Sequence, residues 1–320
     1  MLFATVLLIV GLALLVYGAD RLVYGAAILA RALGLPPFII GLTIVGFGTS
    51  LPELIVSVTA ALNHQVDMAV GNVLGSNIAN ILLILGSATL IRPLTVHSEL
   101  LRREFPLMLL VTVLCGLLLR DNNLSRMDGV ILLAAGGIFL FLMIRMMRLA
   151  QQDGVDSLTQ EQVAELPHAD SNQTVAVLWL ILGLIILPMA ARMVIDNATV
   201  LARYFHISEL TIGLTVLAIG TSLPELATAI VGTLKKEDDI ALGNLIGSNI
   251  FNITIVLGIP ALLSPGVFNP LAFGRDYWVM LGASALLTAL CLSRKRRIGQ
   301  RAGALLLCAF AVYLSVLFFM

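Results

Sequence analysis

The chain contains one stretch of sequence twice, and this duplication limits the folds open to it more than any other feature. Residues 41–86 align without a gap on residues 213–258, and 23 of the 46 aligned positions are identical. Shared apolar composition would reproduce Leu and Ile, but here Thr, Ser, Pro, Glu and Asn match as well. The two halves of the chain therefore arose by duplication.

Both copies lie within apolar stretches of the length that crosses a bilayer, about 20 residues. Apolar residues make up 59% of the chain and charged residues only 12%, so the polar side chains that would cover a soluble surface are missing. The apolar runs are continuous, whereas the strands of a membrane barrel alternate polar and apolar residues. The sequence therefore predicts an all-α integral membrane protein. Ten transmembrane helices are expected, at 2–31, 36–62, 67–91, 104–120, 127–149, 174–203, 209–234, 240–263, 276–293 and 301–319.

Five helices per half is an odd number, so the second half is expected to enter the membrane in the opposite orientation. We predict a first five-helix repeat at 1–149, a cytoplasmic linker at 150–173 and a second, inverted five-helix repeat at 174–320. The linker is acidic and polar, without the residue spacing of a calcium-binding loop, and is interpreted as solvated. Inverted repeats are typical of secondary transporters, whose substrate site lies at the membrane midplane where two broken helices meet.

The basic residues of the loops predict the orientation of the chain. If the N-terminus is outside, the inner loops hold thirteen Lys and Arg residues and the outer loops hold four. This excess follows the positive-inside rule. Both termini are therefore expected on the exterior or periplasmic side.

Each copy has a proline beside a glutamate in the middle of an apolar run, which predicts a broken helix. Pro52 and Pro224 have no amide hydrogen, so the carbonyls of Gly48 and Gly220, four residues earlier, lose their helical partners. Within a membrane, such a carbonyl is tolerated only where it lines a cavity or finds another ligand. A dehydrated cation would be such a ligand.

Oxygen-bearing side chains gather around both breaks. The hydroxyls three and four residues before each glutamate share a helical face with its carboxylate, and the next helix carries a polar stripe at every fourth position. The first copy supplies Thr49, Ser50, Glu53, Ser76 and Asn80, and the second supplies Thr221, Ser222, Glu225, Ser248 and Asn252. Folded together, these residues would form an all-oxygen site of charge −2, which suits a hard cation such as Ca²⁺ or Na⁺ rather than zinc.

These residues could also serve structure alone. A buried glutamate can be protonated and purely structural, and Ser and Asn commonly form hydrogen bonds between membrane helices. However, ionisable residues inside a membrane are functional by default, and the same polar residues recur in both copies. We therefore interpret Glu53 and Glu225 as functional and the surrounding oxygens as their companion ligands.

Other classes of protein find less support. The spans contain no Ser–His pair, nucleophilic Cys or HExxH motif, so a membrane enzyme is disfavoured. The three Cys residues have no paired spacing, which excludes a disulfide scaffold and a zinc site. Nineteen basic residues balance nineteen acidic ones without a concentrated basic face, so no nucleic-acid partner is expected.

No cofactor and no obligate protein partner are indicated. A passive cation channel would need a continuous pore, whereas inverted broken helices favour alternating access.

At these residues the sequence resembles the calcium/cation antiporter superfamily, the sodium/calcium exchangers, whose two inverted repeats carry a Gly-Thr-Ser-Leu-Pro-Glu signature. Both copies of this motif are present, at 48–53 and 220–225, and nearly the whole chain fits the ten-helix arrangement. The resemblance implies exchange of cytosolic Ca²⁺ for external Na⁺ by alternating access. It also implies a bacterial inner membrane location, with the transported cations and the lipid bilayer as partners.

The resemblance further implies roles for individual residues. Glu53 and Glu225 match the calcium-binding carboxylates. The remaining oxygen ligands match Thr49, Ser50, Thr221, Ser222, Ser76 and Ser248, together with the backbone carbonyls near Gly46 and Ala218. Sodium/calcium exchangers often have Asp where this chain has Asn252, so both copies here end in Asn and the site offers two fixed charges instead of three. Two charges neutralise one Ca²⁺ but compensate several Na⁺ less well, so a proton- or potassium-coupled calcium exchanger is kept as an alternative.

Overall fold

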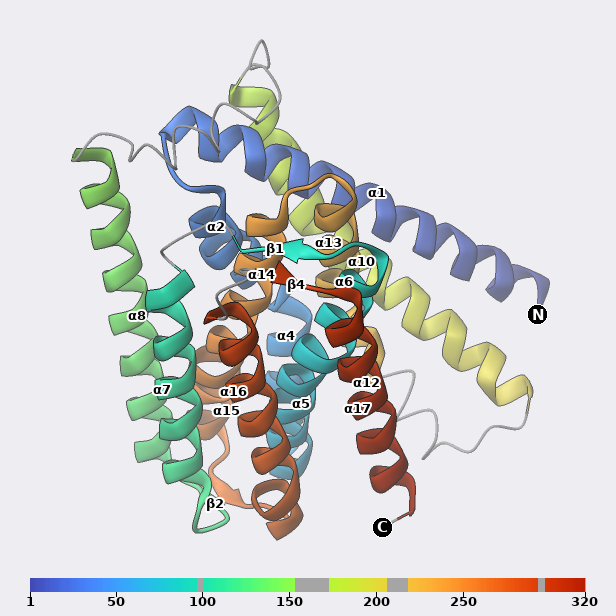
Figure 1. Cartoon of the computed structure of the whole chain (residues 1–320). Helices are drawn as coiled ribbons and strands as arrows, with labels where there is room; N and C mark the ends of the chain where they lie inside the picture. The colour runs from blue at the N-terminus through green and yellow to red at the C-terminus, as the bar shows by residue number, and fades with distance from the viewer. Residues whose placement is uncertain (97–100, 153–172, 206–217, 293–296, 320) are drawn as a thin grey trace.

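A computed structural model describes residues 1–96, 101–152, 173–205, 218–292 and 297–319, which form a helical bundle (Figure 1). The expected linker 150–173 and the beginning of the apolar stretch 209–234 lie largely outside these residues. In chain order the α-helices are α1 (Leu2–Leu33), α2 (Pro37–Ile40), α3 (Gly46–Thr49), α4 (Leu51–Leu62), α5 (Val66–Ala79), α6 (Gly86–Ile91), α7 (Leu101–Leu119), α8 (Arg126–Gln152), α10 (Gln173–Tyr204), α12 (Ala218–Thr221), α13 (Leu223–Leu234), α14 (Asp238–Phe251), α15 (Gly258–Leu263), α16 (Trp278–Leu292) and α17 (Gln300–Phe319). The π-helices are η1 (Gly41–Val45), η2 (Asn80–Leu85), η4 (Asn252–Val256) and η5 (Ala272–Tyr277), and the strands are β1 (Leu94–Thr95), β2 (Asn123–Leu124), β3 (Gly266–Val267) and β4 (Arg297–Ile298).

The length and apolar character of the helices confirm an all-helical membrane protein. Among the described residues, seven helical segments are long and apolar enough to cross a membrane. They are Leu2–Leu33, Pro37–Leu62, Val66–Ile91, Arg126–Arg145, Gln173–Tyr204, Asp238–Leu263 and Gln300–Leu317. Two shorter apolar helices are Glu104–Leu119 and Leu223–Leu234. The expected span 276–293 corresponds to α16, which begins directly after the π-helix η5.

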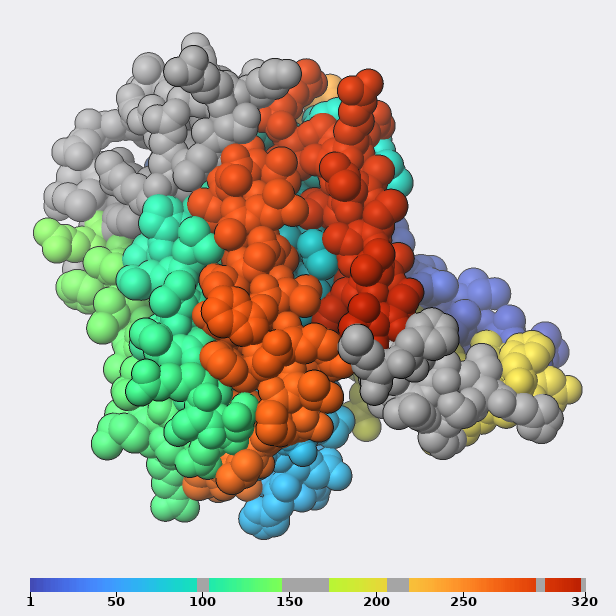
Figure 2. Space-filling view, turned by 60° about the horizontal axis from the view of Figure 1, so that its bottom comes forward, coloured from blue at the N-terminus to red at the C-terminus, as the bar shows by residue number. Residues whose placement is uncertain are grey.

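The two longest helices, α1 and α10, lie side by side and cross the rest of the bundle obliquely (Figure 1). Glycines bring them close together: a Cβ atom on Gly25 would lie 2.9 Å from the backbone nitrogen of Leu180, and one on Gly183 would lie 2.8 Å from the Cβ of Leu22. The first part of α1 and the last part of α10 project beyond the other helices (Figure 2). This pair therefore has much of its length outside the main core.

The predicted helix breaks are present in both copies. Ser50 and Ser222 leave the helical conformation, with ψ angles of 3° and 10°, and a new helix begins at the following residue. Pro52 and Pro224 then occupy the first turn of α4 and α13, where a missing amide hydrogen costs nothing. Each break leaves a glutamate in the first turn of the second helix piece.

A second irregularity also occurs at the same place in both copies. The helices α5 and α14 change to π-helix at Asn80 and Asn252, two residues that match in the sequence repeat. Such π-helical turns inside α-helices are rare and are found frequently at functional sites. The sequence did not predict them, because no residue pattern distinguishes a π-turn from an α-turn in an apolar run.

Two short antiparallel strand pairs join the halves of the chain. β1 pairs with β4, and β2 pairs with β3. The two pairs lie at opposite ends of the bundle (Figure 1). β1 and β3 are 172 residues apart, which is the offset between the two copies of the repeat. Equivalent segments of the two halves therefore lie at opposite ends of the bundle.

An ion pair fastens the first half to the second beside β1. Arg92 binds the carboxylate of Asp238 and donates from Nε to the carbonyl of Thr233, at 3.0 Å. The other oxygen of the Asp238 carboxylate accepts the backbone N–H of Thr95, at 2.9 Å. Since Asp238 is buried, these contacts offset the cost of removing its charge from water.

The turn between α13 and α14 contains a second acidic residue, Glu237, outside the membrane-spanning helices. Burial raises the pKa of Glu237 to about 7; the nearby Lys235 opposes this rise and Asp238 adds to it. The first copy has a neutral Gln65 at the same place, and both turns close with the same 2.8 Å backbone hydrogen bond to a residue five positions earlier.

We expect Glu237→Gln to stabilise the protein at alkaline pH only. Between about pH 4.5 and 7 the folded state keeps a proton that the unfolded state has released, so stability falls as the pH rises through this window. Glutamine does not titrate and removes this loss, which amounts to at most about 3 kcal/mol. Thermal unfolding in detergent at pH 8 and pH 4.5 measures the effect. A variant with the same advantage at both pH values would show that the titration of Glu237 is not the cause.

Candidate cation site

The two glutamates of the repeat are fully buried inside the bundle. Glu53 lies in the first turn of α4 and Glu225 in the first turn of α13. Neither is in an ion pair with a basic residue in the described part of the chain. Two buried carboxyl groups without a basic partner must either be protonated or be neutralised by a cation.

The carboxylate of Glu53 faces hydroxyls from both copies. The Ser222 hydroxyl, in the second copy, donates to its Oε1 at 3.2 Å. Ser76, in the first copy, is buried and also lies near this carboxylate. Behind it, the Asn72 side chain donates to the Glu53 backbone carbonyl at 3.1 Å and to Ser57 Oγ at 2.9 Å, which fixes the first turn of α4.

Glu225 has the corresponding surroundings with the roles of the two copies exchanged. The Ser248 hydroxyl, the counterpart of Ser76, donates to Glu225 Oε1 at 3.5 Å. Thr49, from the first copy, also lies near this carboxylate. The two carboxylates are close enough for their charges to repel each other. Each glutamate is therefore surrounded by its own copy and by the opposite one.

The backbone carbonyl of Gly46 is a second point at which the copies meet. It accepts hydrogen bonds from Ser50 Oγ at 2.9 Å, from Ser248 Oγ at 3.1 Å and, at 3.4 Å, from Thr49 Oγ1. Thr49 also donates to Asn244 Oδ1 at 2.9 Å. The first helix break is thus held against α14 by hydroxyls of both copies.

Four asparagines form a symmetric set of hydrogen bonds between the copies. Asn80 Nδ2 donates to Asn249 Oδ1 at 3.0 Å, and Asn252 Nδ2 donates to Asn77 Oδ1 at 3.1 Å. These two bonds are equivalent, because Asn80 corresponds to Asn252 and Asn77 to Asn249. They occur where both helices change to π-helix, so the irregular backbone brings the amides together.

In the part of the chain that the structure describes, several buried oxygens of these two sets of contacts have no hydrogen-bond donor. They are Glu53 Oε2, Glu225 Oε2, Asn80 Oδ1, Asn252 Oδ1 and the hydroxyl oxygen of Thr221. Buried polar atoms are normally satisfied, and each one left without a partner costs free energy. An excess of buried acceptors around two carboxylates is the arrangement that a hard cation would satisfy.

The structure brings together most of the residues predicted as ligands. Glu53, Glu225, Thr49, Ser50, Ser76, Ser222, Ser248 and Gly46 lie in one set of contacts. Asn80 and Asn252 belong to a second set, the asparagine hydrogen bonds, four residues after Ser76 and Ser248 in the chain. Thr221 is buried beside the second break, but its hydroxyl has no partner. Ala218 is the first residue of α12, directly after the residues that are not described.

Two features of the buried interior were not in the predicted ligand set. Asn77 and Asn249 bind the predicted ligands Asn80 and Asn252, and their identity in the two copies is a signal that could have identified them. Glu104 in α7 is a third fully buried carboxylate. It stands at the very start of an apolar run, where the sequence reads as a helix boundary.

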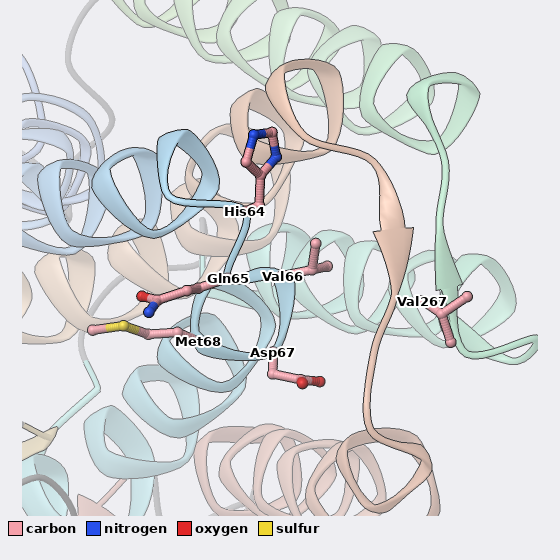
Figure 3. Close-up of a pocket in the computed structure, with 6 residues that line it drawn as sticks. All are labelled: His64, Gln65, Val66, Asp67, Met68 and Val267. Carbon is pink, nitrogen blue, oxygen red and sulfur yellow. The ribbon is translucent and has the colours of Figure 1, made fainter.

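A surface hollow lies at the β2–β3 end of the bundle, apart from this cluster. It is lined by His64, Gln65, Val66, Asp67, Met68 and Val267 (Figure 3). His64 lies 3.0 Å from Ser264 Oγ, and Asp67 accepts the backbone N–H of Asn269 at 2.5 Å. Figure 3 shows the His64 and Asp67 side chains pointing in different directions, so they do not converge on a ligand.

Comparison with known proteins identifies the family to which this chain belongs. The family model described as sodium/calcium exchanger protein matches residues 3–145 and 175–319, so the chain belongs to the sodium/calcium exchanger family. It is 59% identical over 320 residues to the inner membrane protein YrbG of Escherichia coli (strain K12), covering 100% of this chain and 98% of that protein. It is 49% identical to the putative antiporter CaxA of Alkalimonas amylolytica, covering 99% of each. A solved structure of the sodium-calcium exchanger NCX_Mj, soaked with Na⁺ and Sr²⁺, is 29% identical and matches with a TM-score of 0.82 over 98% of each chain.

Proposed function

We propose that this protein is a secondary-active antiporter that exchanges Ca²⁺ for Na⁺ across the membrane by alternating access. The observation that supports it most is the pair of buried glutamates, each with an oxygen that has no donor. Ca²⁺ takes six to eight oxygen ligands, including carboxylates, carbonyls and amides. Among the described residues, the cluster offers these oxygen types and no basic side chain.

The architecture we propose is ten transmembrane helices in two inverted five-helix repeats, with the ion site near the membrane midplane. Three observations support it: the repeat-related helix breaks, the joint cluster of the two glutamates, and the position of corresponding strands at opposite ends of the bundle. Broken helices of inverted repeats commonly form the binding site of a secondary transporter.

We infer that the cation ligands are the twelve residues predicted from the sequence. They are Glu53, Glu225, Thr49, Ser50, Thr221, Ser222, Ser76, Ser248, Asn80 and Asn252, with the backbone carbonyls of Gly46 and Ala218. Of these, only the two glutamates carry charge. They bind and neutralise the cation, while the hydroxyls, amides and carbonyls replace its hydration shell.

Coupled exchange follows from the burial of these charges. Two carboxylates without a cation are costly to keep in a dry interior, so reorientation of an unloaded site is unfavourable. Ca²⁺ and the monovalent ion use the same oxygens and exclude each other. The site therefore changes sides only when loaded, and uptake of one ion drives release of the other.

We propose that the protein resides in the bacterial inner membrane, with both termini in the periplasm. The excess of Lys and Arg in alternate loops supports this orientation. The location is supported by its similarity to an inner membrane protein of Escherichia coli. Its partners are the transported cations and the lipid bilayer, and it uses no cofactor.

Calcium flux in proteoliposomes tests the proposal. Vesicles containing the purified protein are loaded with Na⁺, K⁺ or H⁺ in turn and diluted into radiolabelled Ca²⁺. We expect uptake to depend on an outward Na⁺ gradient and to stop when that gradient is collapsed. If only a K⁺ or H⁺ gradient drives uptake, that ion and not Na⁺ is the coupling ion. Calcium uptake without any counter-gradient would indicate a channel.

A further inference from the structure

The fixed charge of the site can be counted from the structure. Glu53 and Glu225 are buried carboxylates without an ion pair in the described residues, and the described chain contains no group of three or more His, Cys, Asp and Glu that could hold a metal. The third buried carboxylate, Glu104, lies on α7. α7 packs against α14 and η4, and Met108, one turn after Glu104, accepts a hydrogen bond from the Asn249 amide through its sulfur. With both glutamates ionised, the fixed charge at the site is therefore −2.

The asparagines add oxygens to the site without adding charge. Asn80 and Asn252 donate their amide nitrogens to the opposite copy, which leaves their Oδ1 atoms as buried acceptors without a donor. Asn77 is held in turn by the Asn249 backbone carbonyl at 3.2 Å. An amide does not ionise, so this arrangement cannot supply a third negative charge.

The dry surroundings make this charge count decisive. In a buried site of low dielectric constant, unbalanced charge is screened far less than in water. One Ca²⁺ neutralises the two carboxylates, and so do two monovalent cations. A third monovalent cation would leave a net positive charge among fully buried helices.

We propose that the site carries a cation load of +2 in both directions, so that one Ca²⁺ exchanges for two monovalent cations without net movement of charge. This inference rests on the proposed antiport function, and it assigns to Asn80 and Asn252 the role of fixing the charge carried per cycle. Exchange is then driven by the ion gradients alone and does not respond to the membrane potential.

The membrane potential provides the test. Proteoliposomes with a fixed Na⁺ gradient are clamped at 0 or 100 mV with valinomycin and K⁺, and the calcium gradient at equilibrium is measured. If K⁺ proves to be the coupling ion, a protonophore and a pH gradient set the potential instead. We expect the same calcium gradient at both potentials. Exchange of three monovalent cations for one Ca²⁺ moves one charge per cycle, and the calcium gradient at equilibrium would then change by about 50-fold per 100 mV. That result would overturn the inference.

Two variants test the role of the asparagines. Asn252→Asp adds a third carboxylate, and we expect its exchange to become dependent on potential; Asn80→Asp, at the equivalent place, should behave in the same way. The control Gln65→Glu adds a charge in a surface turn and should leave exchange independent of potential. An active Asn252→Asp or Asn80→Asp exchanger that ignores the potential would overturn the role of the amides. If both variants are inactive, the effect of the membrane potential on exchange by the unsubstituted protein still tests the charge carried per cycle.

The two proposals fail in different ways. A protein that moves no Ca²⁺ under any gradient would contradict the antiport function itself. Calcium exchange that varies with potential would leave antiport intact and remove only the charge assignment.

Discussion

Replacing Glu53 or Glu225 with glutamine is expected to abolish calcium exchange while the chain still folds and inserts. Each substitution removes one of the two charges that neutralise Ca²⁺ in a buried site. At an effective dielectric constant near 20, one charge at about 4 Å is worth roughly 4 kcal/mol even for a monovalent partner. This corresponds to a loss of about 1,000-fold in calcium affinity. A neutral amide is easier to bury than a carboxylate, so folding should not suffer.

The measurement is the initial rate of calcium uptake by purified variants in proteoliposomes, with thermal unfolding in detergent to verify folding. The matched control is Glu104→Gln, because Glu104 is also fully buried but lies on α7, and none of the described contacts of the two glutamates involves it. We expect its uptake to remain within about twofold of the parent, since its charge is not used to bind the ion. Near-normal uptake by either Glu53→Gln or Glu225→Gln would remove that glutamate from the site.

The second large effect is expected from Gly243→Ala. A Cβ atom at this position would lie 2.8 Å from the Leu42 nitrogen and 3.2 Å from the Gly41 carbonyl carbon, with the Phe38 carbonyl closer still. These neighbours are backbone atoms of α2 and η1 and cannot rotate away. Helix α14 must therefore move outward, which we expect to cost about 3 kcal/mol. The shift would also disturb the Thr49–Asn244 hydrogen bond next to it.

The sequence repeat supplies the control for this substitution. Gly71 corresponds to Gly243, but it is exposed, and no described atom lies within 4 Å of a Cβ placed on it. Gly71→Ala should therefore stabilise its helix by up to about 1 kcal/mol, because alanine has the higher helix propensity. Thermal unfolding in detergent compares the two variants. Equal effects would show that the close contact at Gly243 does not limit the packing of α14.

The sequence predicted the composition of the cluster because duplication shows which polar residues are held in common. The Gly-Thr-Ser-Leu-Pro-Glu motif identified the breaks, the glutamates and their neighbouring hydroxyls, since a proline within an apolar run interrupts the hydrogen bonds of a helix. The breaks lie at Ser50 and Ser222, two residues before the prolines, where the serines close the first helix piece.

Other features depend on contacts between distant segments and could not be read from one sequence. The π-turns at Asn80 and Asn252 place both asparagines in a symmetric exchange of hydrogen bonds, although local residue preferences there are those of an ordinary apolar helix. The different surroundings of Gly71 and Gly243 are also invisible in the sequence, because the residues are identical and only their neighbours differ. The burial of Glu104 likewise follows from the packing of α7, not from its position in the chain.

The crossed strand pairs have an evolutionary consequence. β1 pairs with β4 and β2 with β3, so every pair takes one strand from each half of the chain. A single half cannot form either pair by itself, whereas two identical halves inserted in opposite directions would form both. If the two halves have the opposite orientations proposed above, an ancestor of half the present length would have formed both pairs as a homodimer whose two subunits entered the bilayer in opposite senses. Gene fusion would then have made this partnership permanent, after which each half was free to diverge.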